Sequence, residues 1–330
     1  MGYSVTDANH GHIPVMVQET LKFLQPAPGK IIVDATLGAG GHAEMLLKKM
    51  TSKGMVIGID CDSHALETAK KRLALWGDNF RAIHGNFQAL EKLLGRHGIK
   101  KIDGLLFDLG VSSMQLDSPQ RGFTYRDDAP LDMRMDQTLS QTALQVLKEM
   151  PRRELSRIFK EYGEERWAAK IAYLIDRHRR TKGDIQSSGQ LVELIKEAIP
   201  PGARHGRGHP AKRVFQALRI KVNKELESLE RALVQGTQIL KPGGRIVVIS
   251  YHSLEDRIVK KYFKEVSREC ICPPKIPVCC CGWTPLLKVL TGRPLRPASD
   301  EIERNPRAAS ARFRAAERTH RLISSNNYGR

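Results

Sequence analysis

A glycine-rich turn near the amino end has the residue types that hold a nucleotide-like cofactor. Residues 34–43 read Asp-Ala-Thr-Leu-Gly-Ala-Gly-Gly-His-Ala, and Gly38, Gly40 and Ala43 satisfy the G-x-G-x-x-G/A spacing of dinucleotide sites. Asp60 follows about 20 residues later, where a carboxylate can accept hydrogen bonds from ribose hydroxyls. The set predicts a ribose-bearing cofactor, either NAD(P) or S-adenosylmethionine. Asp34 favours the second, because its carboxylate can meet a cofactor ammonium group.

Two further groups of polar side chains follow apolar runs that read as strands. Asp108 ends the run 102–108. Ser250 ends the run 245–250, and Tyr251 and His252 follow it directly. The carboxyl ends of the strands line the ligand crevice of an open parallel sheet. We therefore expect Asp108 beside the cofactor, either binding it or accepting a hydrogen bond from a substrate amine. For His252 we expect a substrate contact or a structural role rather than proton transfer.

Five of the six cysteines are close together in the sequence, at positions 270, 272, 279, 280 and 281. The thiolates of Cys270, Cys272, Cys279 and Cys281 are a set that can bind zinc. Their spacing differs from the usual C-x-x-C knuckle, so we expect reduced loop cysteines and no metal. One local cluster in a 330-residue chain is not the disulfide framework of a small secreted protein, which predicts a reducing, cytoplasmic location.

The elements that must position these residues alternate between strands and helices. Apolar runs predict strands at 30–35, 55–60, 80–84, 102–108 and 245–250. Helical patterns separate the first four of these runs, and a helix with apolar residues at three- and four-residue steps is predicted over 214–240. Continuous apolar strands separated by helices indicate an α/β fold, a mostly parallel, doubly wound sheet covered on both faces.

The alternation is interrupted between the fourth and fifth strands. Residues 113–136 show no clear period but include apolar side chains such as Phe123 and Tyr125, so we expect an ordered loop over the site. Purely helical patterns follow at 140–150, 151–162, 164–180 and 188–199. We therefore predict a discontinuous α/β domain over 1–136 and 213–330, interrupted by a helical domain over 137–212.

The chain is strongly basic, with 54 Lys and Arg against 36 Asp and Glu and a net charge of +18. An apolar content of 41% excludes disordered and fibrous classes. No apolar run approaches the ~18 residues of a membrane-spanning helix, so nucleic acid is the first candidate partner. The basic residues gather in three clusters: Arg204, Arg207, Lys212, Arg213, Arg219, Lys221 and Lys224; Arg177, Arg179, Arg180 and Lys182; Arg304, Arg307, Arg312, Arg314, Arg318 and Arg321.

Several longer motifs are specific enough to indicate a family. They are residues 108–117 (DLGVSSMQLD), 121–123 (RGF), 131–136 (LDMRMD), 162–166 (YGEER), 209–226 (HPAKRVFQALRIKVNKEL) and 250–257 (SYHSLEDR). Together they resemble the bacterial ribosomal RNA small subunit methyltransferase H family, from His12 to about Glu317. The resemblance implies a class I S-adenosylmethionine-dependent methyltransferase domain with an inserted all-helical domain that recognises substrate. It further implies methyl transfer to the exocyclic N4 of a cytosine in the decoding region of 16S rRNA, in the small ribosomal subunit or its precursor.

The resemblance also assigns site residues. The cofactor contacts of the family fall on Gly40, Gly41, His42, Asp60, Phe87, Asp108 and Gln115. Other amino-directed methyltransferases carry Asp/Asn/Ser-Pro-Pro-aromatic after the fourth strand, whereas this chain has Asp-Leu-Gly-Val at 108–111. Base stacking must therefore come from elsewhere. We consider Phe123, Tyr125, Arg213, Arg219 and His252 as RNA contacts, with loop packing as the alternative for the two aromatic side chains. A nicotinamide-dependent oxidoreductase and a non-catalytic RNA-binding assembly factor are the competing functions.

Overall fold

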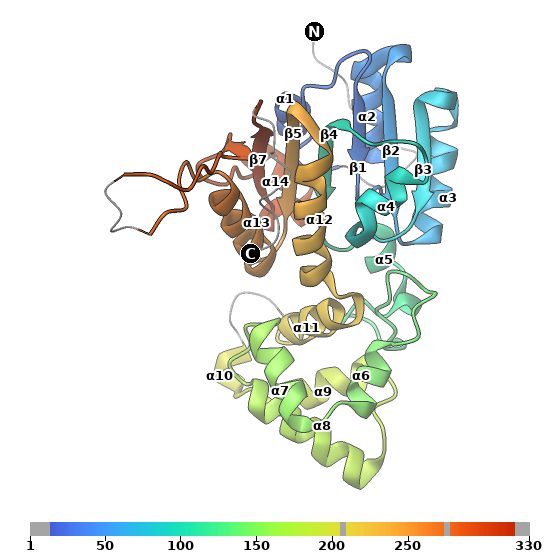
Figure 1. Cartoon of the computed structure of the whole chain (residues 1–330). Helices are drawn as coiled ribbons and strands as arrows, with labels where there is room; N and C mark the ends of the chain where they lie inside the picture. Colours follow the sequence, from blue (N-terminus) through green and yellow to red (C-terminus); the bar gives the residue numbers. More distant parts are fainter. Residues whose placement is uncertain (1–13, 205–208, 274–277, 321–330) are drawn as a thin grey trace. The chain divides into compact units, whose positions relative to one another are not determined.

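The computed structural model describes residues 14–204, 209–273 and 278–320 (Figure 1). The chain divides into two compact units. The first, called the sheet unit below, comprises Met1–Gly110 and Ser228–Arg330, and the second, called the helical unit, comprises Val111–Glu227. No helix within the described ranges is long and apolar enough to cross a membrane.

The sheet unit contains a seven-stranded sheet in the order β3-β2-β1-β4-β5-β7-β6. The first five strands are parallel to their neighbours, and β7 runs antiparallel to both β5 and β6. The order confirms the expected class I methyltransferase fold. The strands are β1 (Ile31–Asp34), β2 (Met55–Asp60), β3 (Phe80–His84), β4 (Ile102–Asp108), β5 (Leu240–Ser250), β6 (Leu287–Val289) and β7 (Arg312–Arg318).

The last two strands are absent from the sequence prediction. β6 has only three residues, and β7 carries arginine or glutamate at four of its seven positions, so neither shows the apolar run of a buried strand. β7 nevertheless pairs along β5 from Arg245 to Ser250. Tertiary pairing and the ion pairs of its arginines therefore outweigh its local sequence pattern.

Helices cover both faces of this sheet, which gives it two apolar cores. On one face Val33, Ile57 and Phe107 pack with α4 (Leu90–Gly95), α12 (Glu225–Ile239) and α13 (Ser253–Val266). On the other face Ile32 and Leu106 pack with the remaining large helices of the unit. These are α1 (Val17–Leu24), α2 (Gly41–Met50) and α3 (Ser63–Arg72), and α14 (Ser299–Arg304) completes the unit. Alternate residues of each strand point to opposite faces, so both faces must be apolar.

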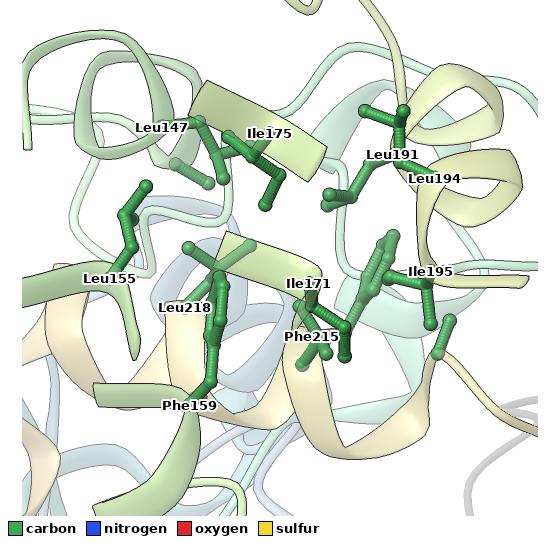
Figure 2. Packing of buried hydrophobic residues seen from close by; sticks show 14 of the residues in the cluster. Leu147, Leu155, Phe159, Ile171, Ile175, Leu191, Leu194, Ile195, Phe215 and Leu218 are labelled. Atoms are coloured by element: carbon green, nitrogen blue, oxygen red, sulfur yellow. The ribbon is translucent and has the colours of Figure 1, made fainter. Parts of the chain in front are cut away.

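The helical unit is larger than the predicted insert of 137–212. Its core includes Phe123, Leu131 and Met133 from the preceding loop and Phe215 and Leu218 from the following helix, so these segments belong to the same compact unit. Figure 2 shows side chains of this core pointing toward one another from several helices. Its helices are α5 (Ser113–Leu116), α6 (Ala143–Glu149), α7 (Arg152–Glu161), α8 (Ala168–Lys182), α9 (Ser188–Ala198), α10 (Pro201–Arg204) and α11 (Lys212–Asn223).

The single helix predicted over 214–240 is wrong. The structure has two helices, α11 and α12, separated at Lys224, which adopts the left-handed conformation with φ of 50°. The Lys224 N–H still donates to the Ile220 carbonyl, as at an ordinary helix end. The break is invisible to periodicity because the apolar residues keep a helical spacing on both sides of it.

Candidate cofactor and active site

Three aspartates end three adjacent strands of the sheet unit. Asp34 ends β1, Asp60 ends β2 and Asp108 ends β4, and β1 lies between the other two strands. The chain continues from β1 to β2 on one side and from β4 to β5 on the other, so the connections diverge between β1 and β4. Such a switch point is where open α/β sheets bind ligands. The structure therefore places the predicted Asp60 and Asp108 at one edge of the sheet, together with Asp34.

The turn after β1 is shaped by its glycines. Gly38 and Gly40 have φ of 53° and 80°, in the left-handed region that other residues rarely adopt. A Cβ on Gly40 would also lie 3.1 Å from Leu73 Cδ1, so the turn packs too closely against α3 for a side chain. The Gly38 N–H donates to Asp60 Oδ2 at 2.8 Å, which joins the turn to the end of β2.

Burial makes Asp34 and Asp60 weaker acids than usual. Asp34 is 1% exposed, and burial raises its pKa to about 7, although nearby His42 acts in the opposite direction. Burial likewise raises the pKa of Asp60 to about 6, against hydrogen bonds from the Asp62 and Gly38 N–H groups. The repulsion from Asp108 and Asp60 also raises the pKa of Asp34. This edge of the sheet therefore holds carboxylates that would be stabilised by an added positive charge.

Asp108 is held by three groups of the sheet unit. Tyr251 donates from its hydroxyl to Asp108 Oδ1 at 2.8 Å, and His42 Nε2 lies 3.4 Å from Oδ2. The Asp108 backbone N–H donates to Thr36 Oγ1 at 2.6 Å. Each carboxylate oxygen can accept a second hydrogen bond, so Asp108 is oriented without being saturated.

His42 is buried, and neither of its ring nitrogens has a partner in full hydrogen-bond geometry, although Nε2 lies 3.4 Å from Asp108 Oδ2. Burial lowers the pKa of His42, but the hydrogen bond and charge of Asp108, together with the charge of Asp34, outweigh it and leave the pKa above the ordinary value. The Nδ1 atom is buried and unpaired among the residues that the structure describes. Buried polar atoms are almost always paired, so this atom marks a place for a ligand group.

These residues fit S-adenosylmethionine, which carries an ammonium group, a sulfonium, a carboxylate and a ribose diol. The carboxylates of Asp34 and Asp108 match its positive charges, and Asp60 has lone pairs left for hydroxyl groups. Helix α2 begins at Gly41 after Gly40, and no side chain caps it, so its first N–H groups suit a carboxylate. Phe87, at the start of the short helical turn after β3, is half-buried and packs edge-on against Phe107, with the ring centroids 5.6 Å apart.

Tyr251 is the participant that the sequence prediction did not assign. Its position directly after β5 was the available signal, because that end of β5 adjoins the end of β4. What the sequence could not supply was the hydrogen bond to Asp108. Burial, followed by the charge of Asp108, raises the pKa of Tyr251 well above its usual value, so the hydroxyl stays protonated and able to donate.

His252 has a structural role within the sheet unit. It is the N-cap of α13, accepts the Glu255 N–H at Nδ1 (3.4 Å), and forms a capping box with Glu255. Its Nε2 lies 3.1 Å from Glu255 Oε1. These contacts give His252 a structural role, and its contact with substrate stays a prediction.

Five of the predicted site residues lie in the helical unit, and the structure describes each of them through its own contacts there. Gln115 is 5% exposed and completes a capping box with Ser112 at the start of α5. Phe123 is 6% exposed and belongs to the core, which explains its apolar character without a stacked base. Tyr125 is only partly buried and stacks on His209, with the ring centroids 4.7 Å apart. Arg219 forms a two-bond ion pair with Glu225, with both distances 2.8 Å.

Many basic residues of the three sequence clusters have partners inside the chain. Arg179 donates to the carbonyls of Leu147, Lys148 and Met150 at the end of α6. Arg312 and Arg314 both bind Asp256. Arg213 is exposed and makes a long contact of 3.4 Å to the Glu164 carbonyl, which leaves it the best-placed of the predicted arginines for a phosphate. Arg207 and Arg321 lie outside the described residues.

Comparisons with known proteins agree with this geometry. Residues 9–319 match the profile of the family described as the MraW methylase family. The chain is 50% identical to Ribosomal RNA small subunit methyltransferase H of Halothermothrix orenii, over 93% of this chain and 98% of that protein. Proteins of the same name from Geobacter sulfurreducens and Carboxydothermus hydrogenoformans are each 52% identical, over 93% of this chain and 98% and 97% of theirs. The chain therefore belongs to the MraW methylase family.

Proposed function

We propose that this protein transfers a methyl group from S-adenosylmethionine to the exocyclic N4 of a cytosine in the decoding region of 16S rRNA. The observation that carries the proposal is the Asp108 carboxylate, oriented by Tyr251 and His42 at the sheet edge that also holds Asp34 and Asp60. Family membership supports both the cofactor and the rRNA substrate and argues against a nicotinamide-dependent oxidoreductase. The reaction belongs in the cytoplasm, where ribosomal subunits are assembled.

The exocyclic amine of cytosine is a poor nucleophile because its lone pair is conjugated with the ring. Bound S-adenosylmethionine supplies an electrophilic methyl group on a good, neutral leaving group. Asp108 accepts a hydrogen bond from the amine, which aims its nitrogen, and its charge stabilises the positive charge that develops on that nitrogen. Tyr251 contacts one carboxylate oxygen and His42 the other, and the two contacts hold the carboxylate in one orientation.

We assign RNA binding to the helical unit. Its exposed basic residues, with Arg213 as the leading candidate, supply sequence-independent affinity through phosphates. Tyr125 is a better candidate than Phe123 for stacking on a base, because Phe123 is used in the core. Arg219 stabilises the end of α11 through Glu225 and is not assigned a phosphate contact.

The direct test uses small subunits from cells that lack this modification. Incubation with the protein and tritiated S-adenosylmethionine should place label in 16S rRNA, and nuclease digestion followed by mass spectrometry should identify N4-methylcytidine. Naked 16S rRNA and complete small subunits are compared to establish which is the substrate. If the rRNA acquires no label and the protein binds the subunit equally well without cofactor, the result would instead support a non-catalytic assembly factor.

Cofactor affinity is expected to increase with pH. Because burial raises the pKa of Asp34 to about 7, its ionised fraction, and with it the attraction for a cofactor ammonium group, should rise about tenfold between pH 6 and pH 8. Calorimetric titration with S-adenosylhomocysteine measures this, and Asp34→Asn should flatten most of the slope. The remainder belongs to Asp60 and His42, whose pKa values are also raised. An affinity that falls with pH, or an unchanged slope in Asp34→Asn, would contradict the assignment.

The ionisation of Asp34 should lower the stability of the cofactor-free protein as the pH rises, whereas it raises the affinity for the cofactor. A raised carboxyl pKa means that the folded state holds the proton more tightly than the unfolded state does. The contribution of protonated Asp34 to the free energy of unfolding is therefore complete below about pH 4 and is lost as the pH rises through 7. The two trends, measured on the same samples, separate binding of the cofactor from folding.

Arg213→Ala should weaken binding to rRNA and make it less sensitive to salt. Loss of one phosphate contact is expected to reduce the slope of log K against log salt by about 1. Filter binding at several salt concentrations provides the measurement. Arg177→Ala is the matched control, because the Arg177 guanidinium is already paired with Glu197 at 2.8 Å and its loss should change the slope less. Equal slopes for Arg213→Ala and the unmodified protein would remove Arg213 from the RNA interface.

A further inference from the structure

Four cysteine side chains converge in the loop between α13 and β6, far in sequence from the residues assigned to methyl transfer. The sulfur atoms of Cys270, Cys272, Cys279 and Cys281 all lie within 4.8 Å of one another. Individual Sγ–Sγ distances are 3.4 Å for 270–279, 3.7 Å for 270–281, 3.9 Å for 272–279 and 3.5 Å for 279–281. All six cysteines of the chain are free thiols rather than disulfides.

These distances match one metal ion at the centre of a tetrahedron. Zn–S bonds of about 2.3 Å place neighbouring sulfur atoms about 3.8 Å apart. Cys280 lies between two members of the group in the sequence but is not part of it. The sulfur atoms of Cys279 and Cys281 therefore belong to the group, whereas the sulfur atom of Cys280 between them does not.

Backbone N–H groups point at sulfur atoms of the group. The Cys272 N–H donates to Cys270 Sγ at 3.3 Å. The Cys280 N–H donates to the Cys272 sulfur, and the N–H groups of Ile271 and Trp283 donate to the Cys281 sulfur. Such hydrogen bonds orient metal ligands and offset the negative charge that four thiolates keep around a divalent ion.

The described residues of the loop, 267–273 and 278–285, have few other contacts that would stabilise it. Its base is closed by the Leu286 N–H, which donates to the Val266 carbonyl at 2.8 Å, and by Trp283 Nε1, which donates to the Arg268 carbonyl at 2.8 Å. Beyond that base, none of the described residues from 264 to 273 or from 278 to 285 is buried. Ile271 and Val278 are 50% and 74% exposed. A segment this long without an apolar core usually needs a cross-link or a metal to hold one conformation.

We propose that Cys270, Cys272, Cys279 and Cys281 bind one structural Zn²⁺ ion. The sequence spacing alone favoured reduced loop cysteines without metal, and the convergence of the four sulfur atoms reverses that expectation. With four thiolate ligands the ion has no open position for water or substrate, so its role is to order the loop and not to take part in methyl transfer. On binding, each thiol releases its proton and no electron is transferred.

Zinc analysis of the purified full-length protein tests the proposal. Elemental analysis should find about one zinc ion per chain. Titration with a reagent that modifies thiols should release that zinc as four cysteines react. Cys279→Ser and Cys281→Ser should each lose most of the zinc, whereas Cys280→Ser, the neighbouring control, should keep it. Co²⁺ added to the metal-free, reduced protein should give the visible absorption bands of tetrahedral thiolate coordination, and these bands should be retained in Cys280→Ser.

Limited proteolysis supplies a second readout. Removal of zinc should make the loop 267–285 susceptible to cleavage, and re-addition of zinc should restore protection. The proposal is overturned by zinc-free protein that also gives no tetrahedral Co²⁺ spectrum, by bound iron in place of zinc, or by an equal loss of metal in Cys280→Ser. These outcomes are independent of the methyltransferase assay, because no ligand belongs to the cofactor or RNA residues.

Discussion

Replacement of Asp108 by asparagine is expected to lower kcat for methyl transfer about 10²- to 10³-fold, the range measured when one preorganised electrostatic contact to a transition state is removed. Asparagine keeps the size of the side chain and an oxygen that can accept from the Tyr251 hydroxyl, now 2.8 Å from Asp108 Oδ1. It removes the negative charge that would stabilise positive charge on the amine. Transfer of tritium to small-subunit rRNA at saturating cofactor measures kcat.

The same variant separates catalysis from cofactor binding. If Asp108 only binds S-adenosylmethionine, Asp108→Asn will weaken binding of S-adenosylhomocysteine while kcat at saturating cofactor stays close to that of the unmodified protein, and the catalytic assignment fails. Tyr251→Phe is the companion variant, because it removes a single hydroxyl and leaves the carboxylate charged. Loss of that one hydrogen bond should reduce kcat by about tenfold or less.

Asp256→Ala is expected to reduce the free energy of unfolding of the sheet unit by about 3–5 kcal/mol, the usual consequence of removing one partner of a buried ion pair. Arg314 donates from Nε to Asp256 Oδ1 at 2.6 Å and from Nη2 to Oδ2 at 3.2 Å, and Arg312 adds a third contact at 3.2 Å. Asp256 and Arg314 are each 7% exposed, so alanine would leave a buried guanidinium without its counter-ion. Chemical denaturation monitored by circular dichroism gives the change.

Asp300→Ala is the matched control, since Asp300 pairs with Arg304 at a similar distance of 2.7 Å but both side chains are more than half exposed. Its effect should stay within about 1 kcal/mol. Burial raises the pKa of Asp256, but the hydrogen bonds and charges of Arg314 and Arg312 outweigh it and leave the pKa below the usual value. The Asp256 contribution is therefore present above about pH 4 and should be lost as the pH falls through its folded pKa. Equal effects of the two alanine variants would show that burial does not control the strength of this pair.

The local pattern of the amino acids determined much of the sheet. The strands predicted at 55–60, 80–84 and 102–108 have those same bounds in the structure. The strands at 55–60 and 102–108 are largely buried and therefore appear as apolar runs, whereas the edge strand at 80–84 is mostly exposed or half-buried and includes Arg81 and His84. The glycine-rich turn was equally readable, since a positive φ at Gly38 and Gly40 restricts the residue type. The aspartates at the strand ends followed from the rule that parallel strands present their carboxyl ends at one edge.

Tertiary structure decided what depends on contacts between distant segments. The hydrogen bond from Tyr251 to Asp108 and the proximity of His42 join residues from three parts of the chain, and no local pattern encodes such a distance. The ion pair of Arg219 with Glu225 and the burial of Phe123 in a core have the same origin, because both depend on where the chain folds back. Four cysteines with an unusual spacing in sequence converge only when the loop closes, since backbone geometry, and not residue spacing, sets the distances between their sulfur atoms.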